Sequence, residues 1–134
     1  MTDQPILKVT RESLASGTIL KMANERNDGA VDIASEDELY ASRRRLVPDD
    51  ADCSDIWIFG YGSLIFNPAV DYVEQAQARI FGNHRCFCLW TCLGRGSPDC
   101  SGLVLALVRG GTCAGIGFRP YPTTAIYELD LLWR

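Results

Sequence analysis

The pattern of apolar and polar residues divides the chain at about residue 52, and the part before that point carries only helical patterns. A first helix is predicted over roughly Arg11 to Glu25, with an interruption at Gly17. A second helix begins after Ser35, because Glu38 stands three residues further on and completes a capping box. The positive charges of Arg43 to Arg45 are favourable at the C-terminal end of this helix, where the helix dipole is negative. We therefore interpret them as a solvated helix end rather than as a localisation or phosphate-binding patch.

After residue 52 the pattern becomes that of strands. The run from Ile56 to Phe59 is apolar, rich in β-branched and aromatic residues, and stops at Gly60, which is typical of a buried strand entering a turn. A second strand is predicted over Arg85 to Cys92. Two further apolar runs, Leu103–Val108 and Cys113–Phe118, flank a Gly-Gly pair. This arrangement predicts a β-hairpin of two antiparallel neighbours.

The end of the chain carries two further patterns. Gly115 and Gly117 alternate along the last predicted strand, so they leave one face bare and predict that another backbone or a ligand comes close. Thr123 or Thr124 could then cap a helix. Its apolar residues recur at spacings of three and four on one face, and they are Ile126, Leu129, Leu132 and Trp133. This helix shows no stop signal before Arg134, so we expect the chain to be a fragment.

Composition and charge narrow the class of protein. With 47% apolar and 22% charged residues among 134, the chain has the composition of a folded globular domain. A net charge of −4 and a pI near 4.9 argue against nucleic-acid or anionic-membrane partners. No apolar run approaches the about 20 residues of a membrane span, and the first residues lack the pattern of a secretory signal. We expect a cytoplasmic protein whose six cysteines are free thiols.

The most distinctive stretch for chemistry is the loop Gly60-Tyr61-Gly62-Ser63, after the first predicted strand. Two glycines around a tyrosine let the backbone turn sharply with its N–H groups outward, and such a cluster binds carboxylate or oxyanion oxygens. The alternative is a plain strand end with a tight turn. The dinucleotide, phosphate-loop and nucleophile-elbow motifs all fail here, because each needs a residue that Tyr61, Gly62 or Ile65 replaces. We therefore do not interpret Ser63 as a nucleophile.

The other reactive side chains favour structural interpretations. His84 has no evident carboxylate partner in the sequence, and a lone histidine is more often structural. Cys86, Cys88 and Cys92 fall on one face of the second predicted strand. Strand neighbours two apart lie roughly 6.6 Å from each other, which is too far for thiolates to converge easily on a metal ion held at about 2.3 Å. We expect these thiols to be small packing residues that bind no metal.

Six segments are distinctive in residue type and in order along the chain. They are Trp57–Pro68, His84–Leu89, Gly94–Gly96, Leu105–Leu107, Arg109–Gly111 and Leu131–Arg134. Together they resemble the ChaC-type glutathione-specific γ-glutamylcyclotransferases over roughly residues 55 to 134. On this basis we divide the chain into a polar, helical N-terminal extension over residues 1–52 and the N-terminal portion of a γ-glutamylcyclotransferase domain over residues 53–134.

The resemblance implies an α+β fold, namely a mixed and mostly antiparallel β-barrel with peripheral helices that is incomplete in this chain. It also implies a lyase that cuts glutathione into 5-oxoproline and cysteinylglycine and needs no cofactor. The partner would then be this small molecule, with no nucleic acid and no membrane. The family loop that grips the γ-glutamyl group corresponds here to Ile58, Phe59, Gly60, Tyr61, Gly62, Ser63 and Leu64.

The resemblance leaves the general base outside the sequence. In the family a single Glu carries the proton, and it follows the segment Leu131–Arg134 by one or two residues, so we assign no catalytic residue and expect this chain to be inactive. Glu128 matches an acidic surface position of the family, and no motif supports Glu74. The alternative is a truncated, non-catalytic remnant that at most binds a γ-glutamyl ligand or a partner. A relative acting on another γ-glutamyl amine is less favoured, because the segments Gly94–Gly96 and Leu131–Arg134 resemble the glutathione-specific branch.

Overall fold

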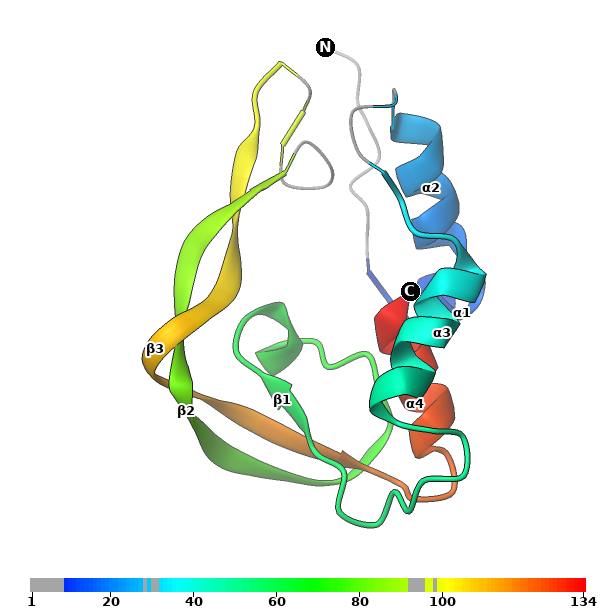
Figure 1. Cartoon of the computed structure of the whole chain (residues 1–134), viewed down its shortest axis with the longest axis vertical. Helices are drawn as coiled ribbons and strands as arrows, with labels where there is room; N and C mark the ends of the chain where they lie inside the picture. Colours follow the sequence, from blue (N-terminus) through cyan, green and yellow to red (C-terminus); the bar gives the residue numbers. More distant parts are fainter. Residues whose placement is uncertain (1–8, 28, 30–31, 92–95, 98) are drawn as a thin grey trace.

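The computed structural model of the protein describes residues 9–27, 29, 32–91, 96–97 and 99–134. Within these residues a three-stranded antiparallel sheet of order β1-β3-β2 lies beside four α-helices. In Figure 1 the helices gather on one side, and β2 and β3 form a long curved ribbon with β1 inside its bend. In chain order the elements are α1 (Arg11–Ala15), α2 (Thr18–Arg26), α3 (Glu36–Leu46), β1 (Ile58–Gly60), the 3₁₀ turn η1 (Ser63–Ile65), β2 (Tyr72–Thr91), β3 (Gly102–Pro120) and α4 (Ala125–Trp133).

The N-terminal helices follow the local sequence patterns closely. Gly17 adopts a φ of +69°, which separates α1 from α2 where the interruption is predicted. The predicted capping box of α3 is present, because the Ser35 hydroxyl accepts the Glu38 N–H while the Glu38 carboxylate accepts the Ser35 N–H. The position of the last helix is also confirmed. Its N-cap is Thr124, although the Thr124 side chain makes no cap hydrogen bond.

The predicted β-hairpin at the Gly-Gly pair is wrong. Gly110 and Gly111 lie inside the single continuous strand β3, which pairs with β2 along its length. Both have positive φ, and so does Gly82 on the opposite strand, beside a register shift in the pairing between Phe81 and Asn83. Left-handed glycines on both strands let the ribbon bend without reversing. The predicted second strand is part of β2, which begins earlier than expected; its last predicted residue, Cys92, lies outside the described residues.

The close approach predicted at the alternating glycines is confirmed. A Cβ added at Gly115 would lie 2.2 Å from the Gly60 carbonyl oxygen and 2.8 Å from the Phe59 ring. A Cβ added at Gly117 would lie 3.0 Å from the Trp57 ring. The bare face of β3 therefore accommodates the backbone of β1 and the aromatic residues around it.

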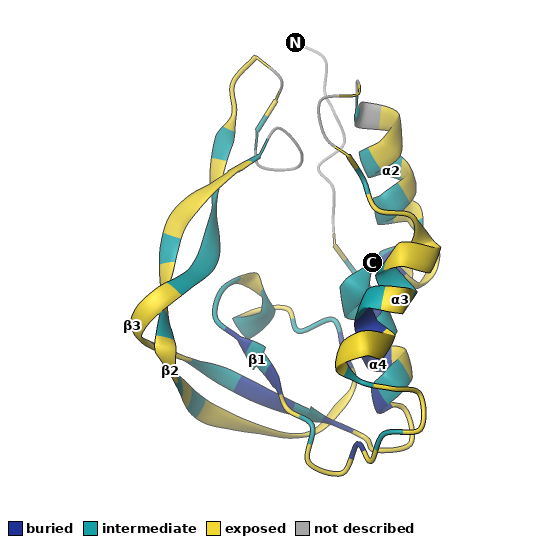
Figure 2. Ribbon diagram, viewed as in Figure 1, coloured by how far each residue is buried: buried dark blue, intermediate teal, exposed yellow. Residues whose placement is uncertain are grey.

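The core lies where the sheet meets α4. Its buried residues are Ile58 of β1, Val70, Phe118 of β3 and Leu129 of α4. Figure 2 shows that exposed residues dominate the rest of the β2–β3 ribbon, far from this core. No helix within the described ranges is long and apolar enough to cross a membrane.

Helix α4 is buried on more than the predicted apolar stripe. Of that stripe only Leu129 is fully buried, whereas Ala125, Glu128 and Leu131 are buried as well. The reason is that α1 and α3 both contact α4 and cover further sides of it. The N-terminal extension and the family-like part of the chain therefore pack together through this helix.

Two charged residues that were predicted to be exposed are buried. Arg43 is not a solvated helix end, because only 1% of it is exposed and it pairs with Asp130 and Asp49, each at 2.7 Å. Glu128 is likewise 1% exposed, so the expected surface position is wrong. Its two carboxylate oxygens accept hydrogen bonds from Arg11 at 2.6 and 2.7 Å. A buried charge needs such partners, and here the two parts of the chain supply them to each other.

Candidate functional site

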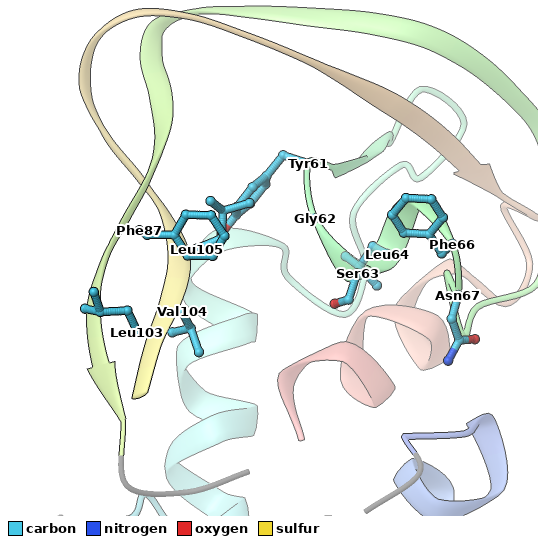
Figure 3. Close-up of a pocket in the computed structure, with 10 residues that line it drawn as sticks. All are labelled: Tyr61, Gly62, Ser63, Leu64, Phe66, Asn67, Phe87, Leu103, Val104 and Leu105. Carbon is cyan, nitrogen blue, oxygen red and sulfur yellow. The ribbon is translucent and has the colours of Figure 1, made fainter. Parts of the chain in front are cut away.

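A cavity of about 660 Å³ lies between the loop that follows β1 and the β2–β3 ribbon. Figure 3 shows Leu64, Phe66 and Asn67 on one side and the ribbon residues on the other, with the Tyr61 ring extending toward Leu105 and the Ser63 hydroxyl directed toward the ribbon. The lining residues are Tyr61, Gly62, Ser63, Leu64, Phe66, Asn67, Phe87, Leu103, Val104 and Leu105. Most of these residues are apolar, so the few polar groups of the loop are the ones that could orient a bound ligand by hydrogen bonds.

Strand β1 and the turn η1 hold the loop in place. Strand β1 pairs with β3 up to Gly60, where an added Cβ would lie only 3.1 Å from the Leu64 Cβ. The chain then turns, and the Ser63 carbonyl accepts the N–H groups of Phe66 at 3.1 Å and Asn67 at 2.9 Å. In the described part of the chain neither the Gly62 N–H nor the Ser63 N–H has a hydrogen-bond acceptor. Donors left unpaired beside a cavity can bind an anion.

The neighbouring segments fix both ends of the loop. The Arg85 guanidinium donates from Nη1 to the Tyr61 carbonyl at 3.1 Å. The Asn67 amide donates to the Val9 carbonyl at 2.8 Å, which ties the loop to the N-terminal segment. The loop is thus held from β2 on one side and from the segment that precedes α1 on the other.

The carboxylates considered as a general base are engaged elsewhere. Glu74 pairs with Arg119 on the adjacent strand at 2.7 Å. Glu128 is held by Arg11, and its hydrogen bond raises the pKa of the Arg11 guanidinium above its usual value. Glu128 also accepts the Asp71 N–H at 3.1 Å. The described residues that line the cavity include no carboxylate.

His84, Cys86 and Cys88 do not line the cavity, and the packing role predicted for the thiols is wrong for Cys88, which is exposed, while Cys86 is only half-buried. The His84 ring hydrogen-bonds through Nδ1 to the Gly110 carbonyl at 2.7 Å, in the bend of the ribbon. Partial desolvation and the neighbouring Cys86 raise the pKa of Cys88, which keeps it a thiol at neutral pH. No group of three His, Cys, Asp or Glu that could hold a metal ion occurs among the described residues. Cys92, the third predicted thiol of that face, lies outside them.

Comparison with known proteins identifies the family to which this fold and loop belong. Residues 56–134 match the family described as ChaC-like protein. The chain belongs to this family. The matched range begins just before β1 and contains the loop, the ribbon and α4, whereas α1, α2 and α3 precede it.

Two relatives of the ChaC-like segment are informative. The glutathione-specific γ-glutamylcyclotransferase of Escherichia coli strain K12 is 44% identical over 79 residues, which are 59% of this chain and 34% of that protein. The chain therefore spans about a third of that relative's length. A crystal structure of a yeast γ-glutamyl cyclotransferase specific to glutathione superposes with a TM-score of 0.54 at 24% identity, over 57% of this chain and 45% of that one. The expected α+β fold is confirmed, with a sheet that is not closed into a barrel.

The ChaC-like loop divides into residues that face the cavity and residues that support it. Of the seven predicted binding residues, the four from Tyr61 to Leu64 line the cavity. Ile58 is in the core, Phe59 lies against the Gly115 backbone, and Gly60 allows the tight turn. Sequence reasoning did not assign the other lining residues, although four of them fall within the motif segments that carry the resemblance, namely Phe66, Asn67, Phe87 and Leu105.

Proposed function

We propose that this chain provides the γ-glutamyl-binding part of an enzyme that cleaves glutathione into 5-oxoproline and cysteinylglycine. The observation that carries the proposal is the pair of unpaired N–H groups at Gly62 and Ser63, which lie beside the cavity in the loop of the ChaC-like segment. The 44% identity to a relative named as a glutathione-specific γ-glutamylcyclotransferase supports the choice of substrate. The free thiols of the described cysteines suit a reducing compartment, so we place the reaction in the cytoplasm.

The reaction is intramolecular. The substrate's α-ammonium first gives a proton to a general base, and the free amine then attacks the γ-amide carbonyl carbon. As the five-membered lactam closes and the bond to the cysteine nitrogen breaks, the attacking nitrogen loses a second proton, and both protons pass to the departing amine, which leaves as an ammonium group. Holding the γ-glutamyl arm folded supplies several kcal/mol through effective concentration. In this chain the loop donors would bind the α-carboxylate while the apolar wall of the ribbon confines the folded arm.

The general base is not proposed among the residues of this chain. Glu74 and Glu128 are both held in ion pairs, and neither lines the cavity. On the family resemblance, we propose that the base follows the segment Leu131–Arg134. We therefore propose that the 134-residue chain binds glutathione without turning it over, which is also what the non-catalytic alternative predicts for this chain by itself.

A chimera distinguishes the binding part of an active enzyme from a non-catalytic remnant. The E. coli relative's residues that follow its matched segment are appended to Arg134, and 5-oxoproline release from glutathione is assayed for the chimera and for the 134-residue chain. We expect turnover by the chimera only. The variant Glu74→Gln in the chimera is a control and should retain activity. A binding-competent chimera without turnover would favour the non-catalytic remnant, whereas turnover by the short chain would make Glu74 and Glu128 candidates again.

A further inference from the structure

Arg85 lies at the edge of the cavity, where it supports the loop through the Tyr61 carbonyl. It is exposed, and it stands two residues before Phe87 on β2. Residues two apart on a strand share a face, so Arg85 is on the side of the ribbon from which Phe87 lines the cavity. Its hydrogen bond to the Tyr61 carbonyl, at 3.1 Å, shows that the guanidinium reaches the loop.

The charge of Arg85 is not neutralised by a neighbour. Within the described ranges no carboxylate lies within 4.0 Å of its guanidinium, whereas five other arginines of the chain have such a partner. These five are Arg11, Arg43, Arg44, Arg119 and Arg134. The hydrogen bond to Tyr61 uses one of the five N–H donors of Arg85. The others are free to bind a carboxylate in the two-pronged geometry that arginine favours.

We propose that Arg85 binds the glycine carboxylate of glutathione. The inference rests on the proposed function, in which the loop donors at Gly62 and Ser63 bind the α-carboxylate of the γ-glutamyl end. Glutathione carries a second carboxylate at its other end, and the residues that line the cavity include no cation to receive it. Arg85 is an unpaired cation fixed at the edge of that cavity. It would therefore distinguish glutathione from γ-glutamyl compounds that lack this group.

A purely structural role for Arg85 makes a different prediction. If its only task were to hold the Tyr61 carbonyl, its loss would disturb the loop and weaken every γ-glutamyl ligand alike. If it binds the glycine carboxylate, its loss affects only ligands that carry that group. Glutathione whose glycine carboxylate is converted to an amide lacks only that charge and so separates the two roles.

The test measures the binding of glutathione and of its glycinamide analogue, γ-glutamylcysteinylglycinamide, to the 134-residue chain by calorimetry. We expect Arg85→Gln to raise the Kd for glutathione about tenfold or more, the loss typical of a hydrogen-bonded charge pair. The Kd for the glycinamide analogue should stay within about twofold, because that ligand makes no such pair. Arg79→Gln is the matched control, since Arg79 is an exposed arginine on the same strand that bonds only to the Thr112 hydroxyl among the described residues. It removes the same charge and should leave both Kd values unchanged.

The other possible outcomes contradict either the proposed role of Arg85 or the proposed function. Equal weakening of both ligands by Arg85→Gln would reduce Arg85 to a support for the loop. No weakening of either ligand would overturn the inference while leaving the proposed function intact. If the unsubstituted chain binds neither ligand, the proposed function fails and the inference fails with it. Matching amide NMR spectra of the two variants show that any difference arises at the site and not from misfolding.

Discussion

At the scale of single residues, the two glycines of the loop have different structural tasks. A Cβ at Gly60 would meet the Leu64 Cβ at 3.1 Å and the Phe118 ring at 3.2 Å, so this position is needed for packing. A Cβ at Gly62 would meet only a Leu105 methyl group at 3.5 Å, which is ordinary contact. A change to alanine should therefore affect the stability of the chain at Gly60 and the binding of the ligand at Gly62.

We predict that Gly62→Ala leaves the stability of the chain unchanged and abolishes detectable glutathione binding. The added methyl group fits against Leu105 but stands beside the N–H groups that we propose to bind the substrate carboxylate. Gly60→Ala is the comparison and should lower the stability by about 1 to 3 kcal/mol through overpacking. Thermal unfolding and calorimetric titration measure the two effects. Normal binding by the Gly62→Ala variant would show that the carboxylate lies elsewhere.

The sequence could not predict which charged residues are buried. Arg43 is the first of three consecutive arginines, and charged residues are almost never fully buried unless they are paired. The pairs that join α4 to the N-terminal helices are far apart in sequence, with Arg43 87 residues from Asp130 and Glu128 117 residues from Arg11. A pattern of neighbours carries no information about such pairs. The loop from Tyr61 to Leu64 was predictable because its residues are contiguous.

At the scale of elements, local interactions were predictable and long ones were not. The capping box of α3 joins residues three apart, so the sequence shows both partners together. The Gly110-Gly111 pair was ambiguous, because positive φ angles serve a hairpin turn and a bend within a strand equally well. The deciding feature is Gly82 on the opposite strand, near the same register shift. That pairing exists only in the folded ribbon.

We predict that the capping box makes the stability of α3 depend on pH. The Glu38 carboxylate accepts the Ser35 N–H and hydroxyl, each at 2.8 Å, and these bonds lower the pKa of Glu38 below its usual range. Because the folded pKa is the lower one, the stabilisation is present above the unfolded pKa of about 4.3 and is lost as the pH falls through the folded value.

The variant Glu38→Gln isolates this charge, since glutamine keeps a neutral hydrogen bond at the same position. Urea unfolding should show the variant to be less stable than the unsubstituted chain at pH 7, with a difference that shrinks as the pH falls below about 4. Asp37→Asn is the control within the same helical turn, where no carboxylate hydrogen bond to a described residue is formed, and it should show a smaller difference. A difference for Glu38→Gln that stays constant with pH would contradict this account.

At the scale of the whole molecule, the N-terminal helices and the ChaC-like segment are joined by ion pairs around α4. Arg11 binds Glu128, and Arg43 binds Asp130, so α1 and α3 each supply an arginine to a carboxylate of α4. Arg134 reaches back in the opposite direction and donates to the Ala15 carbonyl at 2.8 Å. Three arginines therefore cross the boundary between the residues that match the family and those that do not.

The pair of Arg11 and Glu128 should contribute most clearly to stability, because it leaves a buried charge when it is broken. We predict that Arg11→Met lowers the free energy of unfolding by about 2 to 4 kcal/mol, since the Glu128 carboxylate would remain buried with the Asp71 N–H as its remaining partner. This predicted loss is no larger than the loss expected for breaking a fully buried ion pair, because 34% of the Arg11 side chain is exposed to solvent.

Three further variants complete this test, namely Glu128→Gln, its combination with Arg11→Met, and Arg44→Met. Arg11→Met combined with Glu128→Gln should cost less than the sum of the single changes, because the second change removes the unpaired charge that the first creates. Arg44→Met breaks the exposed pair of Arg44 and Asp49, where both side chains are 57% exposed, and should cost at most about 1 kcal/mol. Urea unfolding of all four variants gives the coupling energy. Two results would contradict this account: additive losses of unfolding free energy, or a loss for Arg11→Met no larger than that for Arg44→Met. Either would mean that the ion pair of Arg11 and Glu128 does not stabilise the packing of the N-terminal helices on α4.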